Sequence, residues 1–205
     1  MPEPSFPELI EAMKAAAGIL NDAEIEFVLG GGLSAWARGG PRSEHDVDFL
    51  IKPEDAERAL EAFEASDWKV ERPPEGWLYK TWHENGALVD LIFDPASGPI
   101  TQEIIDRSHE GEVMALRAKV ATLEDVLVSK LMAINEQELN FSSVLEWSRS
   151  LREQIDWREV RERTPGSPFA KAFFVLLEEL DIVDKIPEPR PLRPAADLRG
   201  GKQPT

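Results

Sequence analysis

The sequence contains no cysteine, and no apolar run approaches the ~20 residues that a membrane-spanning helix requires. Without cysteine there is no disulfide framework and no thiol chemistry, and the reducing cytosol is the default compartment. Residues 1–14 also lack the basic start and apolar centre of a signal peptide. We therefore expect a cytoplasmic protein without a membrane partner.

Basic residues are scarce relative to acidic ones. The chain has 23 lysines and arginines against 39 aspartates and glutamates, which gives a formal net charge of -16. This excess argues against attraction of the whole surface to nucleic acid or anionic membrane. We therefore expect no DNA partner, and any contact with RNA would be local. At 205 residues, the chain can bury a substantial core in one domain, or in a core domain with a helical annex.

The hydrophobic pattern predicts an α+β fold in which helices and strands are mixed over the first 120 residues. Expected helices are 6–21, 33–38, 53–66 and 100–107, and expected strands are 26–29, 47–51, 68–70, 77–83, 87–93 and 113–120. From Thr122 to Val183 the pattern is helical, with further starts near Ser143, Asp156 and Ser167. Residues 187–205 contain five prolines and almost no large apolar side chains, which predicts a disordered tail.

Two aspartates, Asp46 and Asp48, stand just before the apolar run Phe49-Leu50-Ile51 and follow a glycine-rich turn at 30–32. In an extended chain the i, i+2 spacing places both carboxylates on one face, where they repel each other. A hard cation would relieve this repulsion, and Mg²⁺ prefers carboxylate oxygen together with water and phosphate. The alternative is a solvated turn before the strand.

A third carboxylate, Asp90, lies in the middle of the apolar strand 87–93. A carboxylate in such a strand is costly unless it is paired or bound to metal. Asn85-Gly86 separates this strand from the strand at 77–83, which is a strong signal for a β-hairpin. The hairpin could bring Asp90 beside the first two aspartates, and metal binding by all three is the interpretation that we favour.

The glycine-rich turn admits two other phosphate-binding interpretations. A P-loop requires Lys-Ser or Lys-Thr at the end of its glycine run, and the turn has neither. Gly30, Gly32 and Ala35 satisfy a dinucleotide-binding pattern, but Gly39-Gly40-Pro41 would break the following helix after about two turns. Neither pattern explains a pair of acids on the next strand.

Gly31-Gly32, a spacer and then Asp46-Val47-Asp48-Phe49 resemble the signature of the polymerase-beta-like nucleotidyltransferase superfamily, with Asp90 as its third acid. The local sequence is most similar to that of minimal bacterial nucleotidyltransferases, including those of toxin-antitoxin and abortive-infection systems. The segment around Lys130 is similar to the start of the helical half of those proteins. The resemblance implies a nucleotidyltransferase core at 1–121, a helical annex packed on it at 122–186, and the tail at 187–205.

The resemblance also implies roles for individual residues. Asp46 and Asp48 would hold one Mg²⁺ ion that bridges the triphosphate of an NTP. Asp90, with one or both of them, would hold a second ion that activates the acceptor hydroxyl. The candidate phosphate contacts are backbone amides, hydroxyls and cations: Gly31, Gly32, Ser34, Arg42, Ser43 and Lys130. For Lys130, an ammonium that extends into water is the alternative.

We therefore expect an Mg²⁺-dependent enzyme that moves a nucleoside monophosphate from an NTP to an acceptor hydroxyl. The acceptor could be the 3′ end of a tRNA, a protein side chain, or a small molecule such as an aminoglycoside, and a cognate antitoxin would be a further partner. A binding scaffold that has kept the fold without turnover is the alternative from another class.

Overall fold

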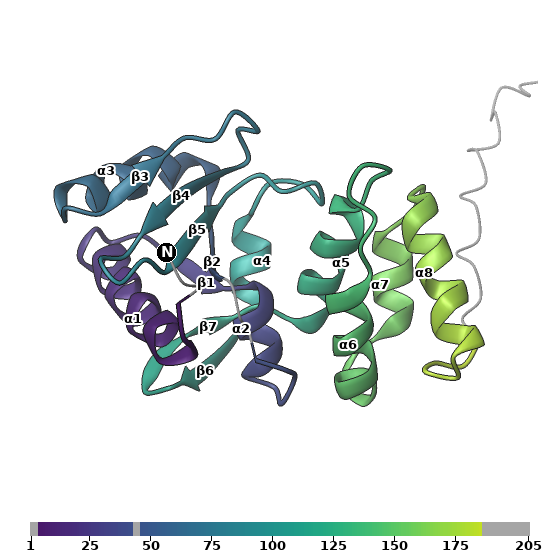
Figure 1. The fold of residues 1–205 in the computed structure, drawn as a ribbon. Helices are drawn as coiled ribbons and strands as arrows, with labels where there is room; N and C mark the ends of the chain where they lie inside the picture. Colours follow the sequence, from purple (N-terminus) through teal and green to yellow (C-terminus); the bar gives the residue numbers. More distant parts are fainter. Residues whose placement is uncertain (1–3, 43–45, 186–205) are drawn as a thin grey trace, which may run out of the picture.

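A single mixed sheet organises the computed structural model, which describes residues 4–42 and 46–185 (Figure 1). Within these ranges the sheet has seven strands in the order β3-β4-β5-β2-β1-β7-β6. The strands are β1 (Phe27–Leu29), β2 (Asp46–Ile51), β3 (Lys69–Glu71), β4 (Leu78–Trp82), β5 (Leu88–Ile92), β6 (His109–Val113) and β7 (Leu116–Val120). Ser43 and the predicted tail at 187–205 lie outside the described residues.

Helices cover both faces of this sheet and continue beyond it, and their combination with a mixed sheet confirms the predicted α+β class. The α-helices are α1 (Phe6–Asp22), α2 (Gly31–Trp36), α3 (Ala56–Ala65), α4 (Gln102–Arg107), α5 (Leu123–Ala133), α6 (Ser142–Leu151), α7 (Trp157–Arg163) and α8 (Pro168–Glu179). Short 3₁₀ turns, η1 (Pro53–Asp55) and η2 (Arg152–Gln154), precede α3 and follow α6. No helix within the described ranges is long and apolar enough to cross a bilayer.

The centre of the sheet brings together segments that are distant in sequence. Strand β2 pairs antiparallel with β1 and parallel with β5, and β4 and β5 form the hairpin that Asn85-Gly86 predicts. Gly86 has a φ of +88°, a conformation that suits glycine in a tight turn. The parallel pairing of β2 with β5 places Asp90, which β5 carries, directly beside β2.

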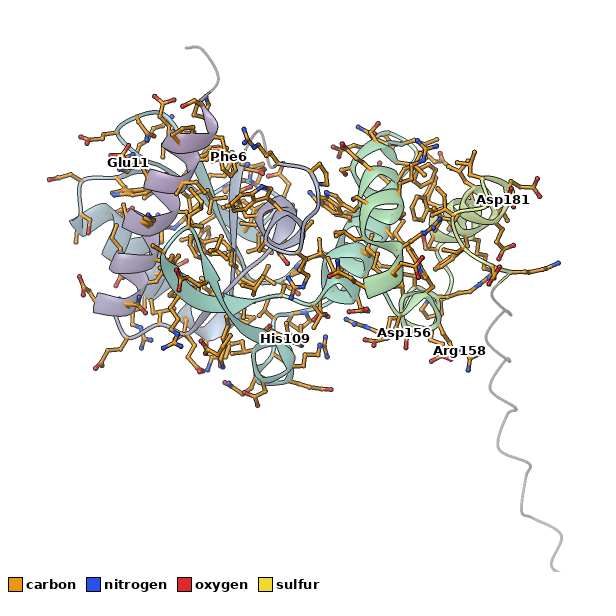
Figure 2. The ribbon with its side chains drawn as sticks, turned by 90° about the horizontal axis from the view of Figure 1, so that it is seen from below. Phe6, Glu11, His109, Asp156, Arg158 and Asp181 are labelled. Atoms are coloured by element: carbon orange, nitrogen blue, oxygen red, sulfur yellow. The ribbon has the colours of Figure 1, made fainter. Side chains whose placement is uncertain are left out.

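Alternation along β2 divides its side chains between the two faces of the sheet. Val47, Phe49 and Ile51 pack into a hydrophobic cluster with α1 and α3. On the opposite face Leu50 packs against a second cluster, which includes residues of α4 and α5 and extends through α6, α7 and α8. The side chains in Figure 2 fill these two regions. Asp46 and Asp48 share the face of Leu50, but at the end of the strand near the glycine turn.

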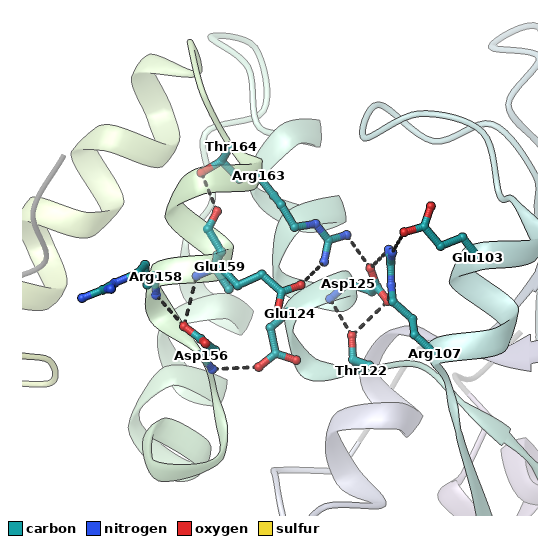
Figure 3. A network of polar contacts seen from close by, with 11 residues as sticks. Glu103, Arg107, Thr122, Glu124, Asp125, Asp156, Arg158, Glu159, Arg163 and Thr164 are labelled. Carbon is teal, nitrogen blue, oxygen red and sulfur yellow. Dashed lines mark hydrogen bonds and ion pairs between the residues drawn. The ribbon is translucent and has the colours of Figure 1, made fainter. Parts of the chain in front are cut away.

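A buried carboxylate, Asp125, links the helical annex to the rest of the chain (Figure 3). Arg107 at the end of α4 donates to Asp125 through Nε at 2.9 Å, and Arg163 at the end of α7 donates to it as well. Burial alone would raise the pKa of Asp125, but the hydrogen bonds from both arginines outweigh it and hold that pKa below its usual value. The carboxylate therefore fastens three helices together.

Arginines of α7 form ion pairs with glutamates of α7 and α8. Arg163 pairs with Glu159 one turn earlier at 2.8 Å, and Arg161 pairs with Glu178 of α8 at 3.1 Å. Arg161 also lies over the ring of Phe174. These arginines therefore serve contacts within the annex.

Two expectations from the sequence need correction. The strand expected at 113–120 is a hairpin of β6 and β7, whose turn is made by Met114 and Ala115 with φ of 51° and 64°. The turn contains none of the usual Asn or Gly residues, so no sequence pattern indicates it. The helix expected at 33–38 begins earlier, because Gly31 and Gly32 form the first turn of α2.

Candidate active site

Strand register brings Asp46, Asp48 and Asp90 together. Asp48 on β2 lies directly opposite Asp90 on β5, and Asp46, two residues earlier, lies on the same face of β2. One carboxylate oxygen from each residue lies within 4.8 Å of the others. Asp48 and Asp90 are buried, with exposures of 8% and 6%, whereas Asp46 is half-buried. The predicted convergence of the three acids is therefore present in the fold.

The glycine turn packs against one of these acids. The amide of Gly30 donates to the carbonyl of Asp48 at 2.9 Å, and Gly31 has a φ of +50°. A Cβ atom built on Gly31 would lie only 1.6 Å from Oδ2 of Asp48. Glycine at this position is therefore required by both the backbone conformation and the space that the carboxylate occupies.

The electrostatics of the buried pair show that its negative charge is poorly compensated by the protein. Burial, followed by repulsion from Asp46, raises the pKa of Asp48 to about 7. Burial also raises the pKa of Asp90 to about 6, although the positive charge of Lys80 opposes this shift. Carboxylate oxygens are the ligands that hard divalent cations prefer, and a bound cation would offset this cost. The donor set therefore fits a divalent ion such as Mg²⁺.

Two lysines lie near the triad. Lys130, on the exposed side of α5, is close enough that its charge lowers the pKa of both Asp48 and Asp90. Lys80, on β4, donates to both carboxylate oxygens of Asp90, at 3.4 and 3.5 Å. The sequence interpretation included Lys130 and missed Lys80. A sequence signal for Lys80 exists. Lys80 and Asp90 each lie five residues from Asn85, the centre of the predicted hairpin, and residues at equal distances from a hairpin turn pair across its two strands.

The other residues suggested as phosphate contacts have different positions. Gly32 lies beside Gly31 in the first turn of α2. Ser34 is fully buried, and its hydroxyl donates to the carbonyl of Ala121 at 2.9 Å and accepts from Arg38 at 3.1 Å. The guanidinium of Arg42 lies over the ring of Phe6, 5.2 Å from its centroid. The hydroxyl of Ser34 is therefore enclosed in the core, and Arg42 packs on α1.

Comparison with solved structures shows a shared fold. Two structures of the antibiotic-resistance factor ANT(2'')-Ia, one in complex with adenylyl-2''-tobramycin, match with a TM-score of 0.53 and 13% and 14% identity. The matches cover 82% and 80% of this chain and 94% and 98% of those chains. The lincosamide antibiotic adenylyltransferase LnuA, with lincomycin bound, matches with a TM-score of 0.51 at 11% identity, over 71% of this chain and 97% of its own.

No curated protein matches the sequence significantly. A family model does match, over residues 9–171, and this range includes the glycine turn, all three aspartates and Lys130. It confirms the resemblance to polymerase-beta-like nucleotidyltransferases and the assignment of the chain as an enzyme of this class. The chain belongs to the family described as nucleotidyl transferase of unknown function (DUF2204).

Proposed function

We propose that this nucleotidyltransferase uses Asp46, Asp48 and Asp90 to hold Mg²⁺ while it transfers a nucleoside monophosphate from an NTP to an acceptor hydroxyl. The observation that carries the proposal is the approach of the three carboxylates to within 4.8 Å, on two neighbouring strands beside a glycine turn. Two of these carboxylates are buried at a cost that their raised pKa values reflect. Carboxylates whose pKa values are strongly raised by burial are characteristic of functional sites.

Each side chain then has a task in the transfer. Bound Mg²⁺ would neutralise charge on the triphosphate and lower the pKa of a coordinated hydroxyl. Asp90, with a pKa of about 6, is ionised at neutral pH and is the group we assign to take the proton of the acceptor hydroxyl. Lys130 pairs with phosphate oxygens, and the amides of Gly31 and Gly32 approach them without obstruction from a Cβ atom. Pyrophosphate is the leaving group.

A small molecule is the acceptor that we place first. The fold likeness to ANT(2'')-Ia extends over 82% of the chain, beyond the sheet and into the helical annex, and that protein carries an adenylylated aminoglycoside in one of its structures. LnuA, with the same fold, is an adenylyltransferase of a lincosamide. The net charge of -16 also suits a cationic acceptor.

A toxin-like enzyme that modifies tRNA or protein, neutralised by a cognate antitoxin, is the second candidate. It is favoured by the sequence of the segment from Gly30 to Ile51, which is most similar to that of the minimal nucleotidyltransferases of such systems. The two candidates share the metal site and differ only in the acceptor. The identity of the labelled product therefore distinguishes them.

The test incubates purified protein with Mg²⁺ and each α-phosphate-labelled NTP in turn. Aminoglycosides, lincosamides, total tRNA and a cell protein extract serve as separate acceptors. We expect label on a small molecule, pyrophosphate release, and loss of both by at least about a hundredfold in Asp48→Asn. Asp55→Asn is the matched control, because Asp55 is equally buried, at 9% exposure against 8%, but lies outside the triad.

The possible results separate the candidates. Label on tRNA or protein would favour the toxin-like enzyme over the small-molecule one. If no NTP gives label or pyrophosphate with any acceptor, although the protein binds nucleotide, the chain is a scaffold and the proposed activity is wrong. Equal activity of Asp48→Asn and wild type would contradict the site assignment even if transfer occurs.

A further inference from the structure

Lys80 is a cation built into the strand next to the triad. Its ammonium lies 3.4 Å from Oδ1 and 3.5 Å from Oδ2 of Asp90, so it faces the carboxylate as a whole. Lys80 is partly exposed, at 31% for the side chain, whereas the Asp90 side chain is 9% exposed. Strand pairing fixes this arrangement, because Lys80 and Asp90 are direct partners in the β4–β5 ladder.

The register of three strands places Lys80, Asp90 and Asp48 in one row across the sheet. Asp90 pairs with Lys80 on one side and with Asp48 on the other. Side chains at paired positions point to the same face. A positive charge therefore occupies one end of the row, on the side of Asp90 that is away from Asp48 and the glycine turn.

The charges of this row limit how many ions the triad can bind. Three ionised carboxylates carry three negative charges, and the adjacent ammonium cancels one of them. Two negative charges remain, which one divalent ion neutralises. A second divalent ion next to Asp90 would lie close to the ammonium and would be repelled by it. Lys130 adds further positive charge near Asp48 and Asp90.

We propose that Lys80 acts as a built-in counter-ion of Asp90, so that in the absence of nucleotide the triad binds a single divalent ion with an affinity that Lys80 lowers. Lys80 is thus a positioning residue, which holds the Asp90 carboxylate and takes the place of a second ion. The inference rests on the proposed metal site. For the protein without nucleotide, it gives one ion and one lysine where the resemblance implies two ions in the reaction.

The test counts Mn²⁺ bound to the full chain without nucleotide at pH 8, by electron paramagnetic resonance of the free ion. We expect one Mn²⁺ per wild-type chain. In Lys80→Met we expect a Kd lower by about tenfold, because a like charge near the ion is removed. Lys80→Arg keeps the charge and should retain the wild-type Kd within about threefold.

Lys119→Met is the matched control. Lys119 is also a lysine on a strand, with 28% side-chain exposure and a single glutamate partner, Glu26, at 3.9 Å. It should bind Mn²⁺ as the wild type does. A Kd that is the same in Lys80→Met and wild type would overturn the role of Lys80. Binding of two ions with similar Kd by the wild type would also overturn it, and this measurement requires no variant. Absence of Mn²⁺ binding by the wild type would instead overturn the metal site itself.

Discussion

Gly31 and Asp48 are packed so closely that the space at one residue is occupied by the carboxylate of the other. A Cβ atom on Gly31 would lie 1.6 Å from Oδ2 of Asp48, far inside any contact distance, and 2.6 Å from its Cγ. The carboxylate cannot move away freely, because Asp48 lies in the middle of the sheet with 8% exposure. The glycine turn and Asp48 thus form one structural unit.

Gly31→Ala should therefore abolish metal binding and nucleotidyl transfer, and it should destabilise the protein. The positive φ alone costs roughly 1–2 kcal/mol for alanine, and the clash would displace the Asp48 carboxylate. Calorimetric Tm and Mn²⁺ binding measure the two effects. Gly76→Ala provides the control, since Gly76 has a φ of +70° with open space around it. It should lose stability and keep Mn²⁺ affinity. Normal Mn²⁺ binding by Gly31→Ala would show that the turn does not set the carboxylate position.

Asp48→Asn should raise the Tm of the metal-free protein at pH 8. The folded-state pKa of Asp48, about 7, is above the value of about 3.9 for an unfolded chain. The native state therefore binds more protons between these values, and wild-type stability falls as the pH rises from about 4 through 7. Asparagine does not titrate, so the difference in Tm should be small near pH 4 and largest at pH 8.

Chelator-treated protein scanned over this pH range gives the comparison. We expect a gain of several degrees at pH 8, since about 1 kcal/mol corresponds to roughly 2–4 °C in a chain of this size. Added Mg²⁺ should raise the Tm of the wild type and leave that of Asp48→Asn unchanged. A pH-independent difference between the two proteins would mean that Asp48 is not the group that titrates.

Lys130→Ala should raise the KM for NTP by about tenfold with a smaller change in kcat, because its ammonium would contact the ground-state triphosphate as well as the transition state. The expectation follows from the position of Lys130, whose charge acts on both Asp48 and Asp90. Steady-state kinetics with saturating acceptor measure both constants. Lys171→Ala on α8 removes another exposed lysine and should leave KM unchanged. An unaltered KM in Lys130→Ala would indicate that the ammonium only reaches water.

Asp125→Ala should lower the stability by about 2–4 kcal/mol, because it removes the shared partner of two arginines at a buried position. Urea unfolding at pH 7 gives the free energy. Glu159→Gln removes an exposed partner of Arg163 and should change stability by less than about 0.5 kcal/mol. Equal effects of the two substitutions would show that burial of Asp125 contributes little.

Much of the site could be predicted because the chemistry is local in sequence. Asp46 and Asp48 share a face by strand periodicity alone, and Asn85-Gly86 predicts the hairpin that carries Asp90. The pairing of β5 with β2 connects segments separated by a helix and two strands, so periodicity could not establish it and the family resemblance had to supply it. Its register, Asp48 opposite Asp90, was visible only in the fold.

Contacts with a partner that is distant in sequence were not visible in the sequence patterns. Ser34 looked available because it follows the glycine turn, yet its partner is the carbonyl of Ala121, 87 positions away. Lys80 was not identified from the sequence, and its position opposite Asp90 follows from the strand pairing. The β6–β7 turn was missed because methionine and alanine, which occupy positions 114 and 115, rarely adopt positive φ.

Helix α5 has a consequence for how such chains could be recombined. It packs on α2 in the core and on α6, α7 and α8 in the annex, and Asp125 near its start binds arginines from both directions. Its other end carries Lys130. A chimaera joined before α5 would bring in a foreign lysine and separate Arg107 from Asp125. A graft that exchanges acceptor-binding helices between relatives should therefore keep α5 with the sheet and also carry over the residue equivalent to Arg163.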